Sequence, residues 1–302
     1  MNIKHKFHTK KQKLSWLLAF VLVLALGACS KKQDKQAQAV KRDAKTIVVG
    51  LPQNPTYTEL FDKGVKPGLE KKGYKVVERT LTDLKTFNSL VGTKEIDINV
   101  GQHKGALDFS ESRDRQNLSP LITIPSAIYG IYSKKLKAKN LEELKKEIKK
   151  GDIVAVPNDP SNLSRSLIFL ENIGLIKLKN TPDKRFSTDK DIVENPYGLD
   201  IRPLESPQIA RSLESITFGL LSGADAIFAG IFDSCITKEV NTDDYYLIIF
   251  AVRTADLNAQ WVKDFVAVVQ SEEFKNVVED KRYIFHKYYR PAWYVKKWKI
   301  NN

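Results

Sequence analysis

The chain has 302 residues, of which 42% are hydrophobic, 28% charged and 10% aromatic; this globular composition excludes a wholly disordered, collagen-like or multi-span membrane protein. The formal net charge of +13 is concentrated at the start, where residues 1–29 hold five lysines and no acid and residues 30–45 contribute a further +4. Residues 46–302 therefore carry only +4, and we expect no nucleic-acid partner for them.

The N-terminus has the layout of a secretory signal peptide. Residues 1–13 are basic, and residues 14–28 form an uncharged run that is shorter than the ~20 residues of a membrane-spanning helix. The run ends in Leu26-Gly27-Ala28-Cys29, which resembles a bacterial lipobox. We predict a lipoprotein signal peptide at 1–28, lipidation of Cys29, and a flexible tether over 29–45. The alternative is a plain signal peptide or anchor helix with an incidental cysteine.

From Thr46 onward, β-rich runs alternate with helical patterns. The expected strands are 46–51, 74–79, 96–100, 152–157, 200–204, 226–230 and 246–252. The expected helices are 58–72, 83–93, 141–150, 162–173, 188–195, 207–222, 259–270 and 272–281. Asn140 and Ser206 are expected to cap two of these helices, and Pro67 to kink or split the first. The alternation predicts a mainly parallel sheet with helices on both faces.

The same pattern occurs in both halves of the chain, and extended segments join the halves. This predicts an α/β, two-lobe periplasmic binding-protein-like fold (type II) with a ligand cleft between the lobes. We place lobe 1 at 46–128 plus 235–302, and lobe 2 at 129–234. Proteins of this architecture close their two halves on a ligand, so the residues at the facing edges of the sheets are the candidates for binding.

Enzyme motifs are scarce in the sequence. It contains no P-loop, no GxGxxG after the first strand, and no HExxH, CxxC or GxSxG. Outside the leader, His103 and His286 are the remaining histidines, and neither has further ligands at metal spacing. We therefore expect a binding protein with no cofactor and no metal. The enzyme alternative, a hydrolase that uses His103 with Asp108 or Asp233, lacks a matched nucleophile. We expect Cys235 to be a small buried residue without a disulfide partner.

Two segments that follow predicted strands carry candidate binding residues. In open α/β sheets, ligands bind beyond the carboxyl ends of strands. Gln102 and a neutral His103, after the strand at 96–100, can hydrogen-bond a polar ligand. Asn162 and Arg165 follow the strand at 152–157 and face the same space, where arginine can clamp a carboxylate bidentately. The alternatives are a surface turn for the first segment, and a capped loop with Arg165 in a structural ion pair for the second.

Several collinear segments resemble one family. They are Ile96–Asp108, Ile131–Lys137, Asn140–Lys145, Val156–Leu167, Glu171–Lys179, Val193–Pro196 and Leu204–Leu213. With the lipobox, they are similar to the NlpA lipoproteins, the methionine-binding (MetQ-like) receptors of ABC importers. The resemblance implies that Arg165 pairs with the carboxylate of a free amino acid, and that His103 and Asn162 fix its polar ends. It also implies an ABC permease with its ATPase as partners, a membrane anchor at Cys29, and a monomeric chain.

The sequence departs from the family pattern at two positions that we include in the binding site. Gly101 stands where the family has an aromatic residue, and Gly230 where it has an asparagine after a strand; Phe232 replaces a second asparagine. An unmet hydrogen bond could cost several kcal/mol for methionine, unless Asp233 holds the amino group. The alternative function is therefore a divergent surface lipoprotein that has lost methionine binding and serves another ligand or an envelope or adhesion role. The basic, aromatic tail after Lys281 either packs its rings or touches lipid headgroups.

Overall fold

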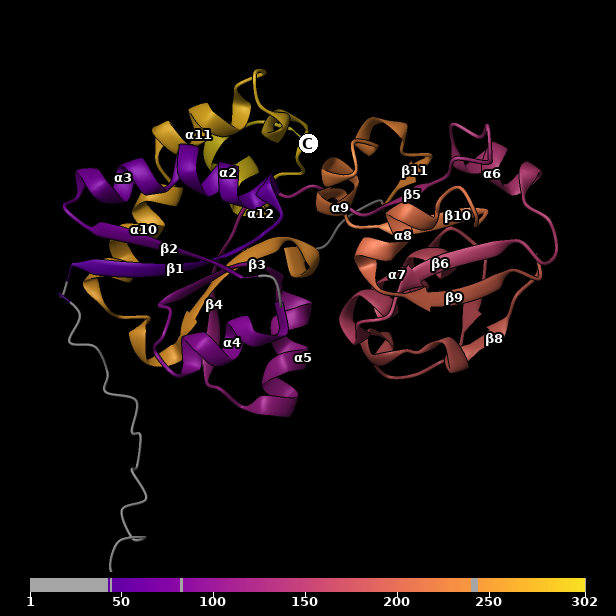
Figure 1. The fold of residues 1–302 in the computed structure, drawn as a ribbon, viewed down its shortest axis with the longest axis horizontal. Coiled ribbons are helices and arrows are strands. Elements are labelled where there is room, and N and C mark those ends of the chain that lie inside the picture. Colours follow the sequence, from indigo (N-terminus) through magenta and orange to yellow (C-terminus); the bar gives the residue numbers. More distant parts are fainter. Residues whose placement is uncertain (1–42, 44, 82–83, 240–243, 302) are drawn as a thin grey trace, which may run out of the picture. The chain divides into compact units, whose positions relative to one another are not determined.

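The structure is a computed structural model that describes residues 43, 45–81, 84–239 and 244–301 (Figure 1). The predicted signal peptide, Cys29 and all of the tether except residues 43 and 45 lie outside the described residues. Asp43–Asn302 form one unit. Within the described ranges, no helix is both long and apolar enough to cross a bilayer.

The first sheet has the strand order β2-β1-β3-β12-β4. Its strands are β1 (Thr46–Pro52), β2 (Lys75–Leu81), β3 (Ile98–His103), β4 (Leu118–Thr123) and β12 (Ile248–Arg253). β1 pairs in parallel with β2 and β3, whereas β12 runs antiparallel to β3 and β4. β1 is almost continuously apolar and buried, as expected for a strand that is covered on both faces.

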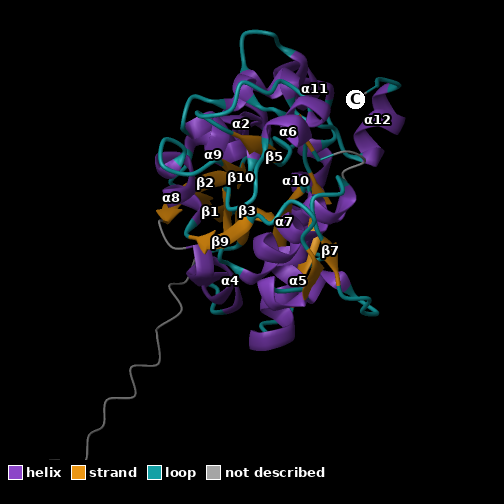
Figure 2. Ribbon diagram, turned by 90° about the vertical axis from the view of Figure 1, so that its right-hand side faces the viewer, coloured by secondary structure: helices purple, strands orange, loops and turns teal. Residues whose placement is uncertain are grey.

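Helices cover this sheet on both faces (Figure 2). They are α2 (Pro55–Gly64), α3 (Lys66–Lys71), α4 (Leu84–Gly92), α5 (Lys104–Asp114), α10 (Gln260–Val269), α11 (Glu272–Glu279) and α12 (Ala292–Trp298). The predicted helix at 58–72 is divided at Val65, beside Pro67, as the proline suggested. α5 and β4 were not predicted from the sequence.

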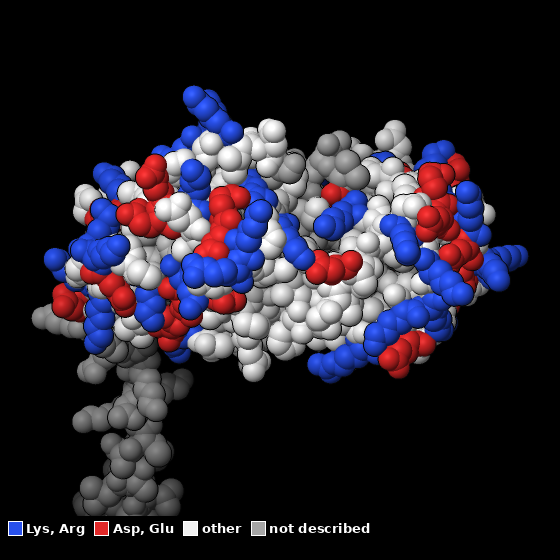
Figure 3. All heavy atoms as spheres, turned by 90° about the horizontal axis from the view of Figure 1, so that it is seen from above, with Lys and Arg blue, Asp and Glu red and all other residues white. Residues whose placement is uncertain are grey.

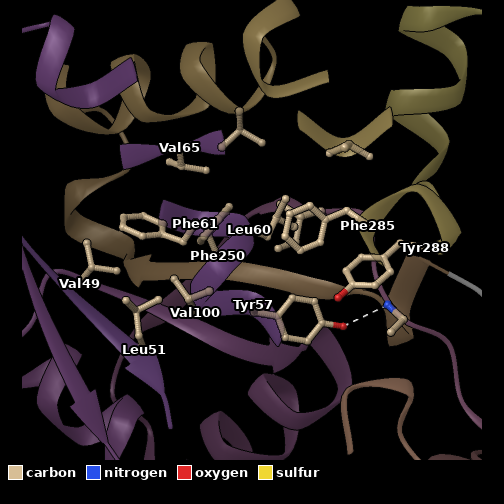
Figure 4. Close-up of a cluster of buried hydrophobic side chains, with 14 of the residues drawn as sticks. Val49, Leu51, Tyr57, Leu60, Phe61, Val65, Val100, Phe250, Phe285 and Tyr288 are labelled. Atoms are coloured by element: carbon tan, nitrogen blue, oxygen red, sulfur yellow. Dashed lines mark hydrogen bonds between the residues drawn. The ribbon is translucent and has the colours of Figure 1, made fainter. Parts of the chain in front are cut away.

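The C-terminal aromatic residues belong to the hydrophobic core. Phe285 and Tyr288 pack with Tyr57 and Leu60 of α2, and the backbone N–H of Ala127 donates to the Tyr57 hydroxyl at 3.2 Å (Figure 4). Tyr294 of α12 is also fully buried, and the Trp293 indole N–H donates to the Thr123 carbonyl oxygen at 2.8 Å. The tail therefore packs its rings against the first sheet's layer of helices.

The second sheet has the order β11-β5-β10-β6-β9. Its strands are β5 (Gly130–Tyr132), β6 (Ile153–Pro157), β9 (Asp200–Leu204), β10 (Phe218–Leu221) and β11 (Thr237–Lys238), and a separate ribbon pairs β7 (Lys177–Leu178) with β8 (Ile192–Glu194). β10, β6 and β9 are parallel; β5 and β11 are antiparallel to their neighbours. Because β11 pairs with β5, the chain returns to the first sheet after Lys238. Both sheets are thus mixed.

The helices of the second half begin at strong local signals. They are α6 (Leu141–Glu147), α7 (Pro160–Asn172), α8 (Ser206–Ser212) and α9 (Gly223–Phe228). Asn140 caps α6 as predicted, because its side chain accepts from the backbone N–H of Glu143. The cap of α8 is Glu205, one residue before the predicted Ser206.

Three predicted elements are wrong. The predicted helix at 188–195 is a 3-10 turn, η2 (Asp189–Asp191), followed by β8. Thr188 caps this turn, but the next residues form β8 and pair with β7 instead of continuing a helix. The predicted helix at 207–222 ends at Ser212, and the fully buried central strand β10 follows it. The apolar residues of β10 continue the helical spacing of α8, so the sequence pattern did not show where the helix ends. The predicted strand at 226–230 is instead α9 and its C-terminal turn, because Ser222 caps a helix there.

Charged side chains of both signs are interspersed over the face in Figure 3. Exposed or half-buried ion pairs among the described residues include Lys66 with Glu78 at 2.6 Å and Lys72 with Asp264 at 3.1 Å. This distribution agrees with the small net charge of residues 46–302.

Gly223 sets how closely α9 approaches the segment that crosses from the first sheet to the second. A Cβ atom there would lie 2.6 Å from the Cβ of Ala127 and 2.6 Å from the carbonyl oxygen of Ile128. We expect Gly223→Ala to lower the free energy of unfolding by about 1–3 kcal/mol through overpacking. The control is Gly92→Ala, whose added Cβ would meet Gln116 at an ordinary 3.4 Å. Urea unfolding should show no loss of stability for the control, with a gain of up to about 1 kcal/mol from the replacement of a helical glycine, and equal losses in both variants would contradict this account.

Candidate ligand-binding site

His103 lies at the end of β3 and caps α5. Its Nδ1 accepts a hydrogen bond from the backbone N–H of Ala106 at 3.1 Å, so the ring proton is on Nε2. Nε2 then donates to Oδ1 of Asn162 at 3.2 Å. Burial, together with the charge of Arg165, lowers the pKa of His103 to about 3. The imidazole is therefore a neutral hydrogen-bond donor at physiological pH.

Asn162 lies in the first turn of α7, after β6. Asp159 caps this helix and accepts from both the backbone N–H and the side-chain amide of Asn162, at 3.0 and 3.1 Å. These bonds orient the Asn162 amide so that its oxygen faces His103. The His103–Asn162 bond consequently joins the first sheet's β3 to the second sheet's α7.

Arg165 lies one turn further along α7 and is only 5% exposed. Its Nε and Nη2 donate to the carboxylate of Glu239, at 3.2 and 2.5 Å, and its Nη1 donates to the carbonyl oxygen of Tyr246 at 3.4 Å. The rings of Tyr129 and Tyr246 lie over the guanidinium, with their centroids 4.8 and 4.7 Å from Cζ. An ion pair of Arg165, left open as an alternative from the sequence, is thus present.

Tyr246 contacts both His103 and Arg165. It ends η4 (Asp244–Tyr246), just before β12, and its ring packs edge-on against His103 at a centroid distance of 5.6 Å. Burial raises the pKa of Tyr246 to about 12 and also raises the pKa of Tyr129, whose hydroxyl lies 2.8 Å from the Ser166 hydroxyl. Both phenols are therefore neutral, and Arg165 and Glu239 carry the charges beside them.

Gln102 and Gly101 precede His103, and their contacts are with residues of the elements next to β3. The Gln102 side chain exchanges two hydrogen bonds with Asn88 of α4, at 2.7 and 3.1 Å. Gly101 lies where the β3–β12 register shifts, with φ +131°. A Cβ there would lie 3.2 Å from Cγ of Pro52. The backbone of this bulge favours glycine, which gives a local reason for the missing aromatic side chain.

The structure does not bring Gly230 into contact with His103, Asn162 or Arg165. Gly230 follows α9 in a left-handed turn with φ +70°, and a Cβ atom there would face open space. Asp233 pairs with Lys287 at 2.7 Å on the surface, and Asp108 pairs with Lys104 at 2.5 Å. Cys235 is half-buried, burial raises its pKa, and its thiol donates to the Thr237 carbonyl oxygen at 3.2 Å. Among the described residues, no cluster of three or more His, Cys, Asp or Glu is placed to hold a metal ion.

The sequence prediction missed several members of the site. Tyr129, Glu239 and Tyr246 come from the segments that cross between the sheets, where neither periodicity nor a motif marks them. A correct assignment of β10 would have drawn attention to the residues after its carboxyl end, Ser222 and Asp225. The Ser222 hydroxyl donates to the Asp225 carboxylate at 2.7 Å, and burial raises the pKa of Asp225.

A small pocket adjoins Tyr246, and His103, Asn162 and Arg165 are not among the residues that line it. A pocket of about 20 Å³ lies against Tyr246, between α5, α7 and η1 (Lys184–Phe186), and is lined in part by Ser161, Ser164 and Arg185. That is room for about one water molecule. A ligand the size of an amino acid can therefore enter this pocket only if the two sheets with their helices move apart.

The comparisons place the chain in a family. Residues 47–293 match the NlpA lipoprotein family. The chain belongs to the NlpA lipoprotein family. It is 33% identical over 269 residues to the probable D-methionine-binding lipoprotein MetQ of Haemophilus influenzae, a match that covers 87% of this chain and 93% of the relative.

Solved structures agree with this assignment. A nutrient-binding protein from Burkholderia cenocepacia bound to methionine shares 30% identity and a TM-score of 0.71, over 78% of this chain and 96% of that one. An ABC transporter periplasmic substrate-binding protein from Coxiella burnetii shares 28% identity and a TM-score of 0.69, over 77% and 95%. The predicted two-lobe fold is confirmed. The NlpA chain is a membrane-anchored envelope lipoprotein of the substrate-binding class, which binds without catalysis.

The low pKa of His103 gives a pH-dependent stability. An unfolded histidine takes up its proton near pH 6.5, whereas folded His103 does so near pH 3, so the unfolded chain binds more protons between these values. The free energy of unfolding should therefore fall as the pH drops below 6.5. In His103→Asn, whose side chain can still cap α5, this contribution is absent. We expect the stability of the wild type relative to the variant to fall by about 2 kcal/mol between pH 7 and pH 5. A difference that stays constant in urea unfolding would contradict the assignment.

Proposed function

We propose that this NlpA lipoprotein is the receptor of an ABC importer and captures a free α-amino acid, methionine or a close relative, between its two lobes. It would then deliver the ligand to a permease driven by an ATPase. The observation that carries the proposal is the meeting of His103 from one sheet with Asn162 and Arg165 from the other. The methionine bound by the Burkholderia protein supports the choice of ligand.

Each residue has a role in this proposal. Arg165 receives the ligand carboxylate, because a guanidinium can form two charge-assisted hydrogen bonds with it. The neutral His103 and the Asn162 amide supply polar contacts on either side of the cleft. Their mutual hydrogen bond links the lobes in the closed form, so ligand binding and closure involve the same side chains.

A second candidate function is a divergent NlpA lipoprotein that no longer binds methionine. The observation that favours it is the Arg165–Glu239 pair, because the guanidinium already has a carboxylate partner within the chain. In that case the two-lobe fold would serve another ligand or an envelope role.

Calorimetric titration separates the two functions. The mature chain in detergent micelles is unfolded and refolded to remove carried-over ligand, and L-methionine and then the other free amino acids are added. We expect micromolar or tighter binding, and at least a 30-fold loss in Arg165→Ala, because about 2 kcal/mol or more of charge-assisted hydrogen bonding is removed.

The matched control is Arg202→Ala, which removes an exposed arginine that pairs with Asp200 on β9. This variant should bind as the wild type does. A folded chain that binds no amino acid would refute the methionine proposal and favour the second candidate.

A further inference from the structure

Glu239 occupies one edge of the Arg165 guanidinium. The side chains of Arg165 and Glu239 are 6% and 11% exposed, so the pair is shielded from solvent. The backbone N–H of Glu239 donates to the carbonyl oxygen of Tyr129 at 2.9 Å, which fixes Glu239 to the other crossing segment. The carboxylate is therefore held in place by the backbone that joins the lobes.

The contacts of Arg165 leave two N–H groups that a ligand could use. A guanidinium has five N–H groups. Nε and Nη2 each donate to Glu239, and Nη1 donates to the carbonyl oxygen of Tyr246. Within the described ranges, these bonds account for three N–H groups and leave one on each Nη, and such N–H groups can donate to a carboxylate.

The charges of the Arg165–Glu239 pair cancel before a ligand arrives. Arg165 contributes +1 and Glu239 −1, and the neutral His103 adds nothing. A ligand that carries a carboxylate alone would bring a net charge of −1 into this buried space, where an uncompensated charge is costly. A zwitterionic ligand would bring none, since its ammonium group balances its carboxylate.

We propose that Glu239 is a positioning and specificity residue: it holds Arg165 by its side edge, and its charge makes the site select zwitterionic amino acids over carboxylates that lack an ammonium group. This inference rests on the proposed function, because it concerns the same site and takes an amino acid as the ligand. It adds a requirement for the ammonium group and assigns that requirement to one residue of the crossing segment.

Two ligands that differ in a single group test the inference. L-Methionine and 4-(methylthio)butanoate share the side chain and the carboxylate, and only the first has the ammonium group. We expect calorimetry on the refolded mature chain to give at least a 30-fold preference for methionine. In Glu239→Gln the preference should fall at least 10-fold, and the desamino acid should bind more tightly than it does to the wild type.

Two further variants serve as controls. Glu239→Asp keeps the charge and should keep the preference within threefold. Glu194→Gln removes a carboxylate that is 59% exposed and pairs with Lys177, and it should bind both ligands as the wild type does. Circular dichroism checks that each variant is folded; if Glu239→Gln does not fold, equal binding of both ligands by the wild type, or a lost preference in Glu239→Asp, would still overturn the specificity role.

The outcomes distinguish this inference from the proposed function. If the wild type binds both ligands equally, or if Glu239→Gln weakens both by the same factor, the specificity role is overturned while the receptor function stands. If the wild type binds neither methionine nor any other amino acid, the receptor function fails and the inference fails with it.

Discussion

The buried guanidinium of Arg165 is the constraint around which the site is organised. A positive charge that is 5% exposed requires a counter-charge and partners for its N–H groups. The protein supplies these from three places: Glu239 on one crossing segment, the carbonyl oxygen of Tyr246, and two aromatic rings over the faces. Within the described residues, these contacts use three of the five N–H groups of Arg165 and hold its side chain in one position.

The same residues also join the two lobes. Tyr129 and Glu239 lie on the segments that join the two sheets, Arg165 belongs to the second, and Tyr246 leads back into the first. His103 bonds to Asn162 across the cleft and packs against Tyr246. Separation of the lobes would therefore break the His103–Asn162 bond, whereas Arg165 and Glu239 both lie on the side of the second sheet.

Local signals predicted much of the fold and part of the site. Strand and helix alternation, the Asn140 cap and the split near Pro67 follow from residues close together in the sequence. His103, Asn162 and Arg165 were chosen as candidates because they follow predicted strands, and β3 and α7 bring His103 and Asn162 into contact. Glu239 could not be found this way, because its partner is 74 residues away in the sequence. The helical spacing that runs from α8 into β10 concealed a central strand. Gly230 was included because of the family resemblance and an expected strand at 226–230, which is α9 and its C-terminal turn.

A double-mutant cycle on unfolding free energy, without ligand, tests the central role of the ion pair most directly. Arg165→Met and Glu239→Gln each leave one buried charge uncompensated and should each cost about 3–5 kcal/mol. The double variant removes both charges and should cost at least 2 kcal/mol less than the two single costs together. Costs that add to within about 0.5 kcal/mol would show that the two groups do not depend on each other, and would contradict this account of the site.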